Sequence, residues 1–478
     1  MTGGSDAPLL ISGDGSTAVS TDELYAHSRR LVTTAAAADD WTAAIASAAW
    51  AGGVPGAAEL DDARRRASAI GEKARGLASA LERSAEAYGL LESLAARTQE
   101  VAAGVLGWMA GLFSPVLAAG AVAVAIDASL AFFAVIGVRR MLGLPTEIDV
   151  AALARQHRRV VNNPMTVAAV RLLVSSVDDA AAGAAHLPPQ VSRALDDVGI
   201  TGVRSSAFGA VVLGGLFGVL REGPVRVRQT DARGEAVATT SRRGADTGAI
   251  AGSPVAAPSG IEDLLSRVPP PSDDDPQVRV ERFGDDWVVY IGGTIGWELS
   301  GSTEPWDLTS NVQAMAGGDP ASYRAVQDAL HQAGVRPGDP VLAVGHSQGG
   351  MLAALLAQDP DISCTGLVTA GAPIAGVELP PDVPLLQLEH TDDIVPALAG
   401  MERTDYADGQ LLVRREFLAA GSDDGRSVVP AHELAGYRQT AALVDSSPDP
   451  RLQAFRAQLD EFTGKASGTA TWWRGVRD

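Results

Sequence analysis

Hydrophobic and polar positions divide the chain into regions with different periods. Residues 21–220 carry apolar positions at helical spacing and are rich in alanine, which predicts a helical domain. Residues 221–275 are rich in Gly, Pro, Ser and Asp and keep no sustained apolar period, so they predict a flexible linker, with some strand character at 225–230. Residues 1–20 are Gly-, Ser- and Asp-rich and predict a flexible N-terminus. In residues 276–478, apolar runs alternate with amphipathic stretches, the pattern of a βαβ sheet.

The third region yields separate predictions for its strands and helices. Strands are expected at 278–283, 287–293, 340–345, 366–371, 384–390 and 411–417. Helices are expected at 322–334, 349–358 and 432–444. Continuous apolar strands with helices between them favour a mostly parallel sheet that is covered on both faces. The predicted fold class is therefore α/β, preceded by an all-α N-terminal domain.

Length, charge and cysteine content narrow the function classes. A chain of 478 residues is long for one domain and predicts at least two. The formal net charge is −20 and no dense Lys/Arg run occurs, so nucleic acid is not an expected partner. The single cysteine, Cys364, excludes an internal disulfide. Residues 1–20 have no charged stretch followed by an apolar one, so we expect no signal peptide.

Two apolar segments of the helical region, 101–138 and 205–220, have two alternative interpretations. Val101–Ile126 carries no charge and is long enough to cross a bilayer, but it is rich in Ala and Gly and interrupted by Pro115. The second segment is short for a span. Both segments are either membrane-associated helices, which would make a membrane surface a partner, or buried helices of an all-α domain.

A short motif interrupts the helical pattern near its start. Trp50-Ala51-Gly52 lies between two stretches of helical spacing, which predicts a helix–turn–helix hairpin, and a Y-x-x-x-E follows at Tyr88–Glu92. The pair resembles the W-x-G family of type VII secretion substrates. The resemblance implies a type VII secretion partner and a secreted or cell-envelope location. The alternative is an ordinary Ala-rich hairpin of a cytoplasmic protein, in which Trp50 packs the turn.

A candidate nucleophile lies in the third region. Gly345-His346-Ser347-Gln348-Gly349 fits G-x-S-x-G between a predicted strand and a predicted helix. That context matters because the nucleophilic serine of such a motif occupies a strained turn at a strand's carboxyl end. The pentapeptide alone is weak in a chain with 52 glycines. In this context it predicts Ser347 as the nucleophile and the Gln348 amide as an oxyanion donor; the alternative is a Gly-rich turn without chemistry.

The acid and the base follow from their order along the chain. In this kind of site the acid follows the serine and the histidine follows the acid. Of the seven histidines, only His432 lies downstream of the DDIVP segment, so it is the candidate base. Asp392 and Asp393 lie just past a predicted strand, where catalytic groups gather in parallel sheets. Asp393 is the preferred acid, and Asp392 stays open as the alternative.

A second oxyanion donor is expected at the end of an early strand. Gly292-Gly293-Thr294 follows the predicted strand at 287–293 and would bring the Thr294 N–H, and its hydroxyl, to the substrate. A simple Gly-Gly turn is the alternative.

Four segments of residues 276–478 together resemble a known family: YIGGT, GHSQGG, DDIVP and AHELAGY. They are similar to the lipase and esterase branch of the α/β-hydrolases, including the fungal-type triacylglycerol lipases. The resemblance implies a Ser347–His432–Asp393 triad and an oxyanion hole at Thr294 and Gln348. It further implies a carboxylic ester hydrolase that forms an acyl-enzyme on an ester or lipid substrate and needs no cofactor and no metal.

Some features leave the function open. The third region has no obvious lid helix, and residues 397–430 are its one sizeable insertion before the histidine. Four apolar residues are candidates for an acyl-chain site or for the core: Trp297, Trp306, Met351 and Leu398. The alternative function class is a type VII-secreted or envelope interaction protein that uses the hydrolase fold as a scaffold.

Overall fold

The computed structural model describes a defined part of the chain. The described residues are 9–13, 21–50, 60–79, 158, 162–168, 170–171, 222–235, 252–272, 275–296, 302–400, 403, 406–418, 427–463 and 467–478. The predictions made for 101–138, 205–220, Gly52 and the Tyr88–Glu92 motif lie outside these residues.

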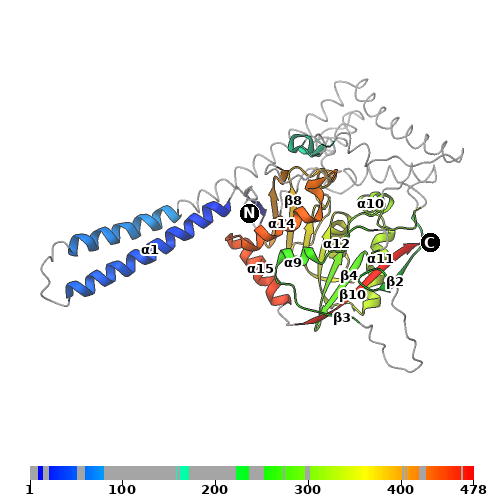
Figure 1. Ribbon diagram of the computed structural model, residues 1–478, viewed down its shortest axis with the longest axis horizontal. Coiled ribbons are helices and arrows are strands. Elements are labelled where there is room, and N and C mark those ends of the chain that lie inside the picture. Colours follow the sequence, from blue (N-terminus) through cyan, green and yellow to red (C-terminus); the bar gives the residue numbers. More distant parts are fainter. Residues whose placement is uncertain are drawn as a thin grey trace, which may run out of the picture.

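A ten-stranded mixed sheet forms the centre of the described structure, in the order β1-β9-β8-β7-β6-β5-β4-β10-β2, with β3 paired to β10 (Figure 1). The strands are β1 (Leu10–Gly13), β2 (Val225–Thr230), β3 (Ser253–Val255), β4 (Val278–Phe283), β5 (Asp286–Ile291), β6 (Pro340–His346), β7 (Ser363–Ala370), β8 (Leu385–His390), β9 (Gln410–Arg415) and β10 (Gly468–Arg477). Strands β5 to β9 are parallel, and the pairings outside them are antiparallel. The six expected strands are confirmed, but the parallel arrangement holds only for the centre of the sheet.

Helices cover both faces of the sheet, which confirms the α/β class. One face carries α10 (Leu308–Met315), α11 (Ala321–Ala333) and α12 (Gln348–Gln358). The other carries α9 (Ile261–Ser266), α14 (Leu434–Ser446) and α15 (Pro450–Thr463). The central strands read as continuous apolar runs because successive side chains point to opposite faces and both faces are buried. In β5, Val289 and Ile291 pack toward α12, whereas Val288 and Tyr290 pack toward α14.

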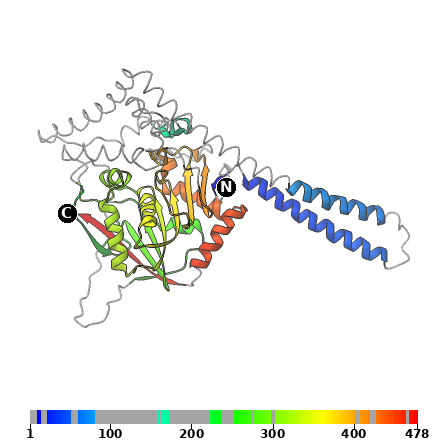
Figure 2. The same cartoon turned by 180° about the vertical axis from the view of Figure 1, so that it is seen from behind.

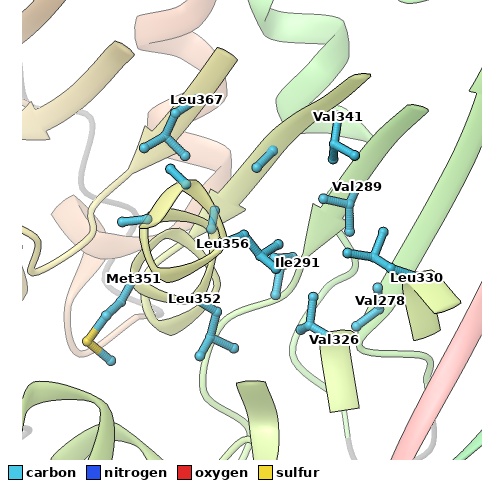
Figure 3. Packing of buried hydrophobic residues seen from close by; sticks show 14 of the residues in the cluster. Val278, Val289, Ile291, Val326, Leu330, Val341, Met351, Leu352, Leu356 and Leu367 are labelled. Carbon is cyan, nitrogen blue, oxygen red and sulfur yellow. The ribbon is translucent and has the colours of Figure 1, made fainter. Parts of the chain in front are cut away.

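The face beneath α11 and α12 shows how tightly the site is supported (Figure 3). Val326 and Leu330 of α11 pack with Val289 of β5 and Val341 of β6, and each is almost fully buried. Helix α11 ends at Ala333 and is capped by Gly334, whose left-handed φ of 103° suits a residue without a side chain. This packing fixes the strands whose carboxyl ends carry the candidate site.

Segments expected to be flexible contribute to the sheet, and this corrects the sequence-based expectation for them. Residues 10–13, from the expected flexible N-terminus, form β1 and pair with β9, with Ile11 fully buried. Within the expected linker 221–275, β2 and β3 pair with β10. Helix α9 of the same segment buries Ile261. Its first N–H groups are capped by Asp445, which accepts from Ile261 N at 2.8 Å. Strand β2 confirms the strand character expected at 225–230, whereas local composition does not indicate β1, β3 or α9, which tertiary contacts stabilise.

The N-terminal region contains a pair of helices, α1 (Thr21–Trp50) and residues 60–79, which extends away from the sheet (Figures 1 and 2). Small side chains lie between the helices: Ala35, Ala38, Ala67, Ala74 and Ala78 are buried. Arg75 Nη1 and Asp39 Oδ2 join the two helices at 2.8 Å. The two expected helical stretches are confirmed for these residues. Among the helices that the structure describes, none combines the length and the hydropathy needed to cross a bilayer.

Candidate active site

The candidate nucleophile lies at the junction of β6 and α12. Ser347 has φ 55° and ψ −124°, and it is the one non-glycine among the described residues with a positive φ. Such a conformation costs on the order of 1–3 kcal/mol and persists only where the surroundings enforce it. Here the Ser347 N–H donates to Ala370 O of β7 at 2.8 Å, and α12 begins at the next residue. The predicted strand–turn–helix context of the serine is therefore present.

The glycines of the motif are required by close backbone contacts. A Cβ at Gly345 would lie 2.2 Å from Gly349 O, and a Cβ at Gly349 would lie 2.1 Å from Ile291 O. Both distances are far below a van der Waals contact, so any other residue would push α12 away from β5 and β6. The G-x-S-x-G spacing thus reflects the packing of this turn as well as its conformation.

The three residues expected to form a triad come together at the carboxyl end of the sheet. Ser347 Oγ lies 2.9 Å from His432 Nε2, and His432 Nδ1 lies 2.7 Å from Asp393 Oδ2. Ser347 is at the start of α12, Asp393 follows β8, and His432 ends a short 3₁₀ helix, η2 (Pro430–His432). Both distances are within hydrogen-bond range, so a proton on the serine hydroxyl has a direct path to the imidazole.

The two adjacent aspartates have different partners. Asp392 accepts hydrogen bonds from Phe417 N at 3.0 Å and from Leu418 N at 2.7 Å. Its carboxylate is thus directed at the chain after β9. Burial raises the pKa of Asp392 above its ordinary value even though these N–H groups oppose the shift. Of the two aspartates that the sequence left open, Asp393 is the one whose carboxylate contacts His432.

The Asp393 carboxylate is buried and accepts hydrogen bonds from His432, Val395 N and Tyr437. Burial alone would raise its pKa, but the attraction of His432 and the hydrogen bonds from His432, Val395 N and the Tyr437 hydroxyl hold the pKa below its ordinary value. Tyr437 Oη donates to Asp393 Oδ2 at 2.8 Å and accepts from the backbone N–H of His390 at 3.1 Å. An ionised acid at this position fixes the orientation and tautomer of the His432 ring.

Two histidines that the sequence reasoning did not assign to the site support the loop that carries His432. His346 Nε2–H donates to His432 O at 2.8 Å, and His390 Nδ1–H donates to Ala431 O at 2.6 Å. Burial, and for His346 the neighbouring His432, lowers the pKa of His346 to about 3; burial lowers that of His390 to about 4. Both rings are therefore neutral at neutral pH. The sequence could have indicated both residues by their positions, because His346 lies inside the G-x-S-x-G motif and His390 at the end of a predicted strand.

The ring of His390 is held on both sides. It stacks on Tyr437, with ring centroids 4.0 Å apart and planes 5° apart, and on Phe417 at 4.9 Å. Its Nε2 lies 2.7 Å from Thr440 Oγ1 in α14, and this nitrogen accepts from the hydroxyl because Nδ1 carries the proton. The tautomer of His390 is thereby fixed by its two partners.

The loop that carries Thr294 reaches the nucleophile through Gly293, and Gln348 directly follows Ser347. A Cβ at Gly293 would be 3.3 Å from Ser347 Cβ, so this backbone approaches the serine directly. The Thr294 Oγ1 accepts from Asn311 Nδ2 of α10 at 2.9 Å, which leaves the Thr294 hydroxyl proton to another acceptor. Gln348 is the first residue of α12, where backbone N–H groups have no partner within the helix.

The four candidate acyl-contact residues do not form one group. Trp306 is fully buried, and its indole N–H donates to Gly292 O at 3.1 Å, so it belongs to the core and supports the Gly292-Gly293-Thr294 loop. Met351 is buried against α10 and the sheet, and Leu398 is 42% exposed. Trp297 lies outside the described residues.

An apolar pocket of about 150 Å³ lies beside α12. Met351 and Leu355 line it on the helix, facing the turn at 317–318 and the loop at 376–377. Met351 is one helical turn from Ser347, but Ser347, Asp393 and His432 do not line the pocket. The pocket therefore does not define where a substrate binds.

Within the described part of the chain, no three His, Cys, Asp or Glu side chains form a group able to hold a metal ion. The side chains that the fold brings together at this site are a serine, a histidine and an aspartate in hydrogen-bonded series. In the comparisons with known proteins, no family model, no curated protein and no solved structure matches this chain.

Proposed function

We propose that the protein is a serine hydrolase of the α/β-hydrolase type that cleaves carboxylic esters. The observation that carries the proposal is the hydrogen-bonded series from Ser347 Oγ through His432 to Asp393, with distances of 2.9 and 2.7 Å. The strained backbone of Ser347 at a strand–helix junction is a second, independent support, because this conformation exposes a nucleophile at a sheet's carboxyl end.

Each residue has a defined step in the proposed reaction. Ser347 Oγ attacks the ester carbonyl while His432 Nε2 accepts its proton, and Asp393 stabilises the imidazolium. The N–H groups of Gln348 and Thr294 stabilise the oxyanion of the tetrahedral intermediate. Its C–O bond then breaks, His432 returns the proton to the leaving alcohol, and an acyl-Ser347 remains. A water molecule, deprotonated by His432, then attacks the acyl carbonyl. The bond to Ser347 Oγ breaks, His432 returns the proton to Ser347 Oγ, and the carboxylic acid leaves. Each oxyanion donor of this kind contributes about 10²- to 10³-fold to kcat.

The proposal is tested with a series of p-nitrophenyl esters of rising acyl-chain length. We expect saturable hydrolysis by the wild-type protein, with a chain-length preference that defines short esters or lipids as the substrate class. Ser347→Ala should abolish it while leaving the melting temperature nearly unchanged, since the side chain makes a single described hydrogen bond, to His432. Hydrolysis that persists in Ser347→Ala would refute the assignment of the nucleophile.

A second proposal concerns location, and it is compatible with the first. The pairing of α1 with residues 60–79 favours a helical hairpin, and Trp50 is the last residue of α1. We propose that this hairpin serves in type VII export, which would make the protein secreted or envelope-associated. Trp50→Ala should abolish export, and Trp41→Ala is the matched control, since Trp41 is exposed on the same helix. Equal export of both variants would contradict the proposal.

A further inference from the structure

The loop that carries His432 is held by side chains that reach its backbone carbonyls. His346 donates to the carbonyl of His432 and His390 to that of Ala431. A third carbonyl, Val428 O, accepts from Asn162 Nδ2 at 2.9 Å. His346 and His390 belong to the sheet, whereas Asn162 lies 266 positions away from Val428, in the N-terminal half of the chain.

A second contact joins the same N-terminal segment to the strand end beside the site. Arg171 Nη2 lies 2.8 Å from Glu389 Oε2, and the two side chains are 9% and 2% exposed. Glu389 is the next-to-last residue of β8, directly before His390, and its other carboxylate oxygen accepts from Gln387 Nε2 at 2.7 Å. A buried carboxylate with a well-oriented guanidinium partner is held in one place, because moving either group leaves a buried charge unpaired.

These two contacts place residues 162–168 and 170–171 against the carboxyl end of the sheet. Figures 1 and 2 both show this short helical segment next to the ends of β8 and the loop before α14. Residues 164–168 form a helical turn that Asn163 caps, with Asn163 Oδ1 accepting from Met165 N at 2.8 Å. Met165 itself is 79% exposed. The segment therefore touches the site through Asn162 and Arg171, and the turn between them buries Val167 while Met165 faces solvent.

We propose that Asn162 and Arg171 are positioning residues of the hydrolase site. Asn162 holds the loop that carries His432 through Val428. Arg171 holds the end of β8, where His390 supports that loop, through Glu389. A segment outside the hydrolase domain therefore sets the alignment of the general base. This inference rests on the proposed function for its kinetic consequence. Its structural consequence, the orientation of His432, does not depend on it.

These contacts control the alignment of the His432 ring with Ser347 and Asp393. Two hydrogen bonds orient the His432 ring, from Nε2 to Ser347 Oγ and from Nδ1 to Asp393 Oδ2. They keep this geometry only while the backbone of residues 428–432 stays in its position. Displacements of about 1 Å in such groups are enough to cost on the order of 10²-fold in rate. Loss of one of three backbone anchors should lower kcat by about fivefold to tenfold, with KM changed less than twofold.

The first experiment uses Asn162→Asp in the full chain, with Met165→Ala as the matched control on the same turn. The substitution keeps the size of the side chain but replaces the N–H donor by an oxygen that faces Val428 O. Two quantities are measured: kcat and KM on a p-nitrophenyl ester, and the downfield proton NMR signal of His432 Nδ1–H. We expect kcat to fall and the NMR signal to broaden or move in Asn162→Asp, with both unchanged in Met165→Ala.

Arg171 gives an independent second test. Arg171→Met should lower kcat and disturb the same NMR signal, and Arg171→Lys should restore both in part, since a cation still faces Glu389. If Asn162→Asp and Arg171→Met lose only melting temperature, while kcat and the NMR signal well below melting match the wild type, the proposal is overturned.

The two proposals fail in different ways. A wild-type protein without esterase activity, in which Asn162→Asp still moves the His432 signal relative to Met165→Ala, refutes the hydrolase assignment and supports the positioning role. If the wild-type protein is active and both Asn162→Asp and Arg171→Met keep its kcat, KM and His432 NMR signal, the positioning role is refuted and the hydrolase assignment stands.

Discussion

The candidate site and the N-terminal hairpin are built in opposite ways. At the site, contacts join residues far apart in the chain, such as His432 with Ser347 and with Asp393, and the buried Asp393 carboxylate accepts hydrogen bonds from both His432 and Tyr437. In the hairpin, two consecutive helices pack through alanines. Four of the large apolar side chains that stay exposed lie there: Val32, Trp41, Ile70 and Leu77. Substitutions should therefore change kcat and the free energy of unfolding strongly at the site, where polar groups are desolvated, and only weakly on the hairpin.

The largest difference is expected between the two adjacent aspartates. Asp393→Asn should lower kcat by about 10⁴-fold, because a neutral amide no longer fixes the His432 tautomer. Asp392→Asn, its matched control, should leave kcat within about tenfold and lower the free energy of unfolding by ~1–3 kcal/mol through weakened bonds to Phe417 N and Leu418 N. Ester kinetics and urea unfolding measure both; the reverse ranking of kcat would contradict the assignment of the acid.

The buried histidines of the site predict acid sensitivity. The pKa of His346 is lowered to about 3 and that of His390 to about 4, whereas both take up protons near pH 6.5 in the unfolded chain. The unfolded state therefore binds more protons as the pH falls below about 6.5. The free energy of unfolding should drop by about 2 kcal/mol per histidine between pH 8 and pH 5. Urea unfolding at the two pH values measures this.

A matched variant assigns this acid sensitivity. His390→Gln removes one titrating group, so its stability should change less between pH 8 and pH 5 than that of the wild type. The same slope in both proteins would show that His390 is not a source of the effect.

Removal of the Tyr437 hydroxyl should have an intermediate effect on kcat/KM. Tyr437→Phe removes the donor to Asp393 Oδ2 and keeps the stacking on His390. Loss of one bond to a buried carboxylate should lower kcat/KM by about tenfold, equivalent to ~1.4 kcal/mol of transition-state stabilisation. Steady-state kinetics measure the effect, and an unchanged kcat/KM would remove Tyr437 from the account of the site.

The smallest effect is expected on the hairpin. Trp41 is 56% exposed on α1, and Trp41→Ala should change the free energy of unfolding by less than about 0.5 kcal/mol and leave kcat unchanged. Thermal melting and ester kinetics check this together. A clear loss of kcat would show that the hairpin and the site are coupled.

Much of the fold could be predicted because its signals are local. The central strands β4 to β9 follow from apolar runs, and the proximity of Ser347, Asp393 and His432 follows from the order of motifs on a parallel sheet. Strand β2 is indicated by VRVRQT at 225–230, but strands β1 and β3 and helix α9 lie in Gly-, Pro- and Ser-rich segments and depend on distant partners such as β9, β10 and Asp445. Strand β10, absent from the expectations, depends likewise on pairing with β4 and β2.

The site's supports were out of reach of sequence patterns for the same reason. The distinction between Asp392 and Asp393 depends on where the N–H groups of Phe417 and Leu418 point. The contact of Asn162 with Val428 joins residues 266 positions apart. No periodicity or motif spacing encodes such pairs.

The central claim is that Ser347 is a nucleophile activated by His432, and covalent labelling tests it most directly. The wild-type protein is incubated with a fluorophosphonate probe, and the modified peptide is identified by mass spectrometry. One probe per chain on Ser347 is expected, with slower labelling in Asp393→Asn than in Asp392→Asn and none in Ser347→Ala. A folded wild-type protein that stays unlabelled, or that is labelled equally in Ser347→Ala, would contradict the account.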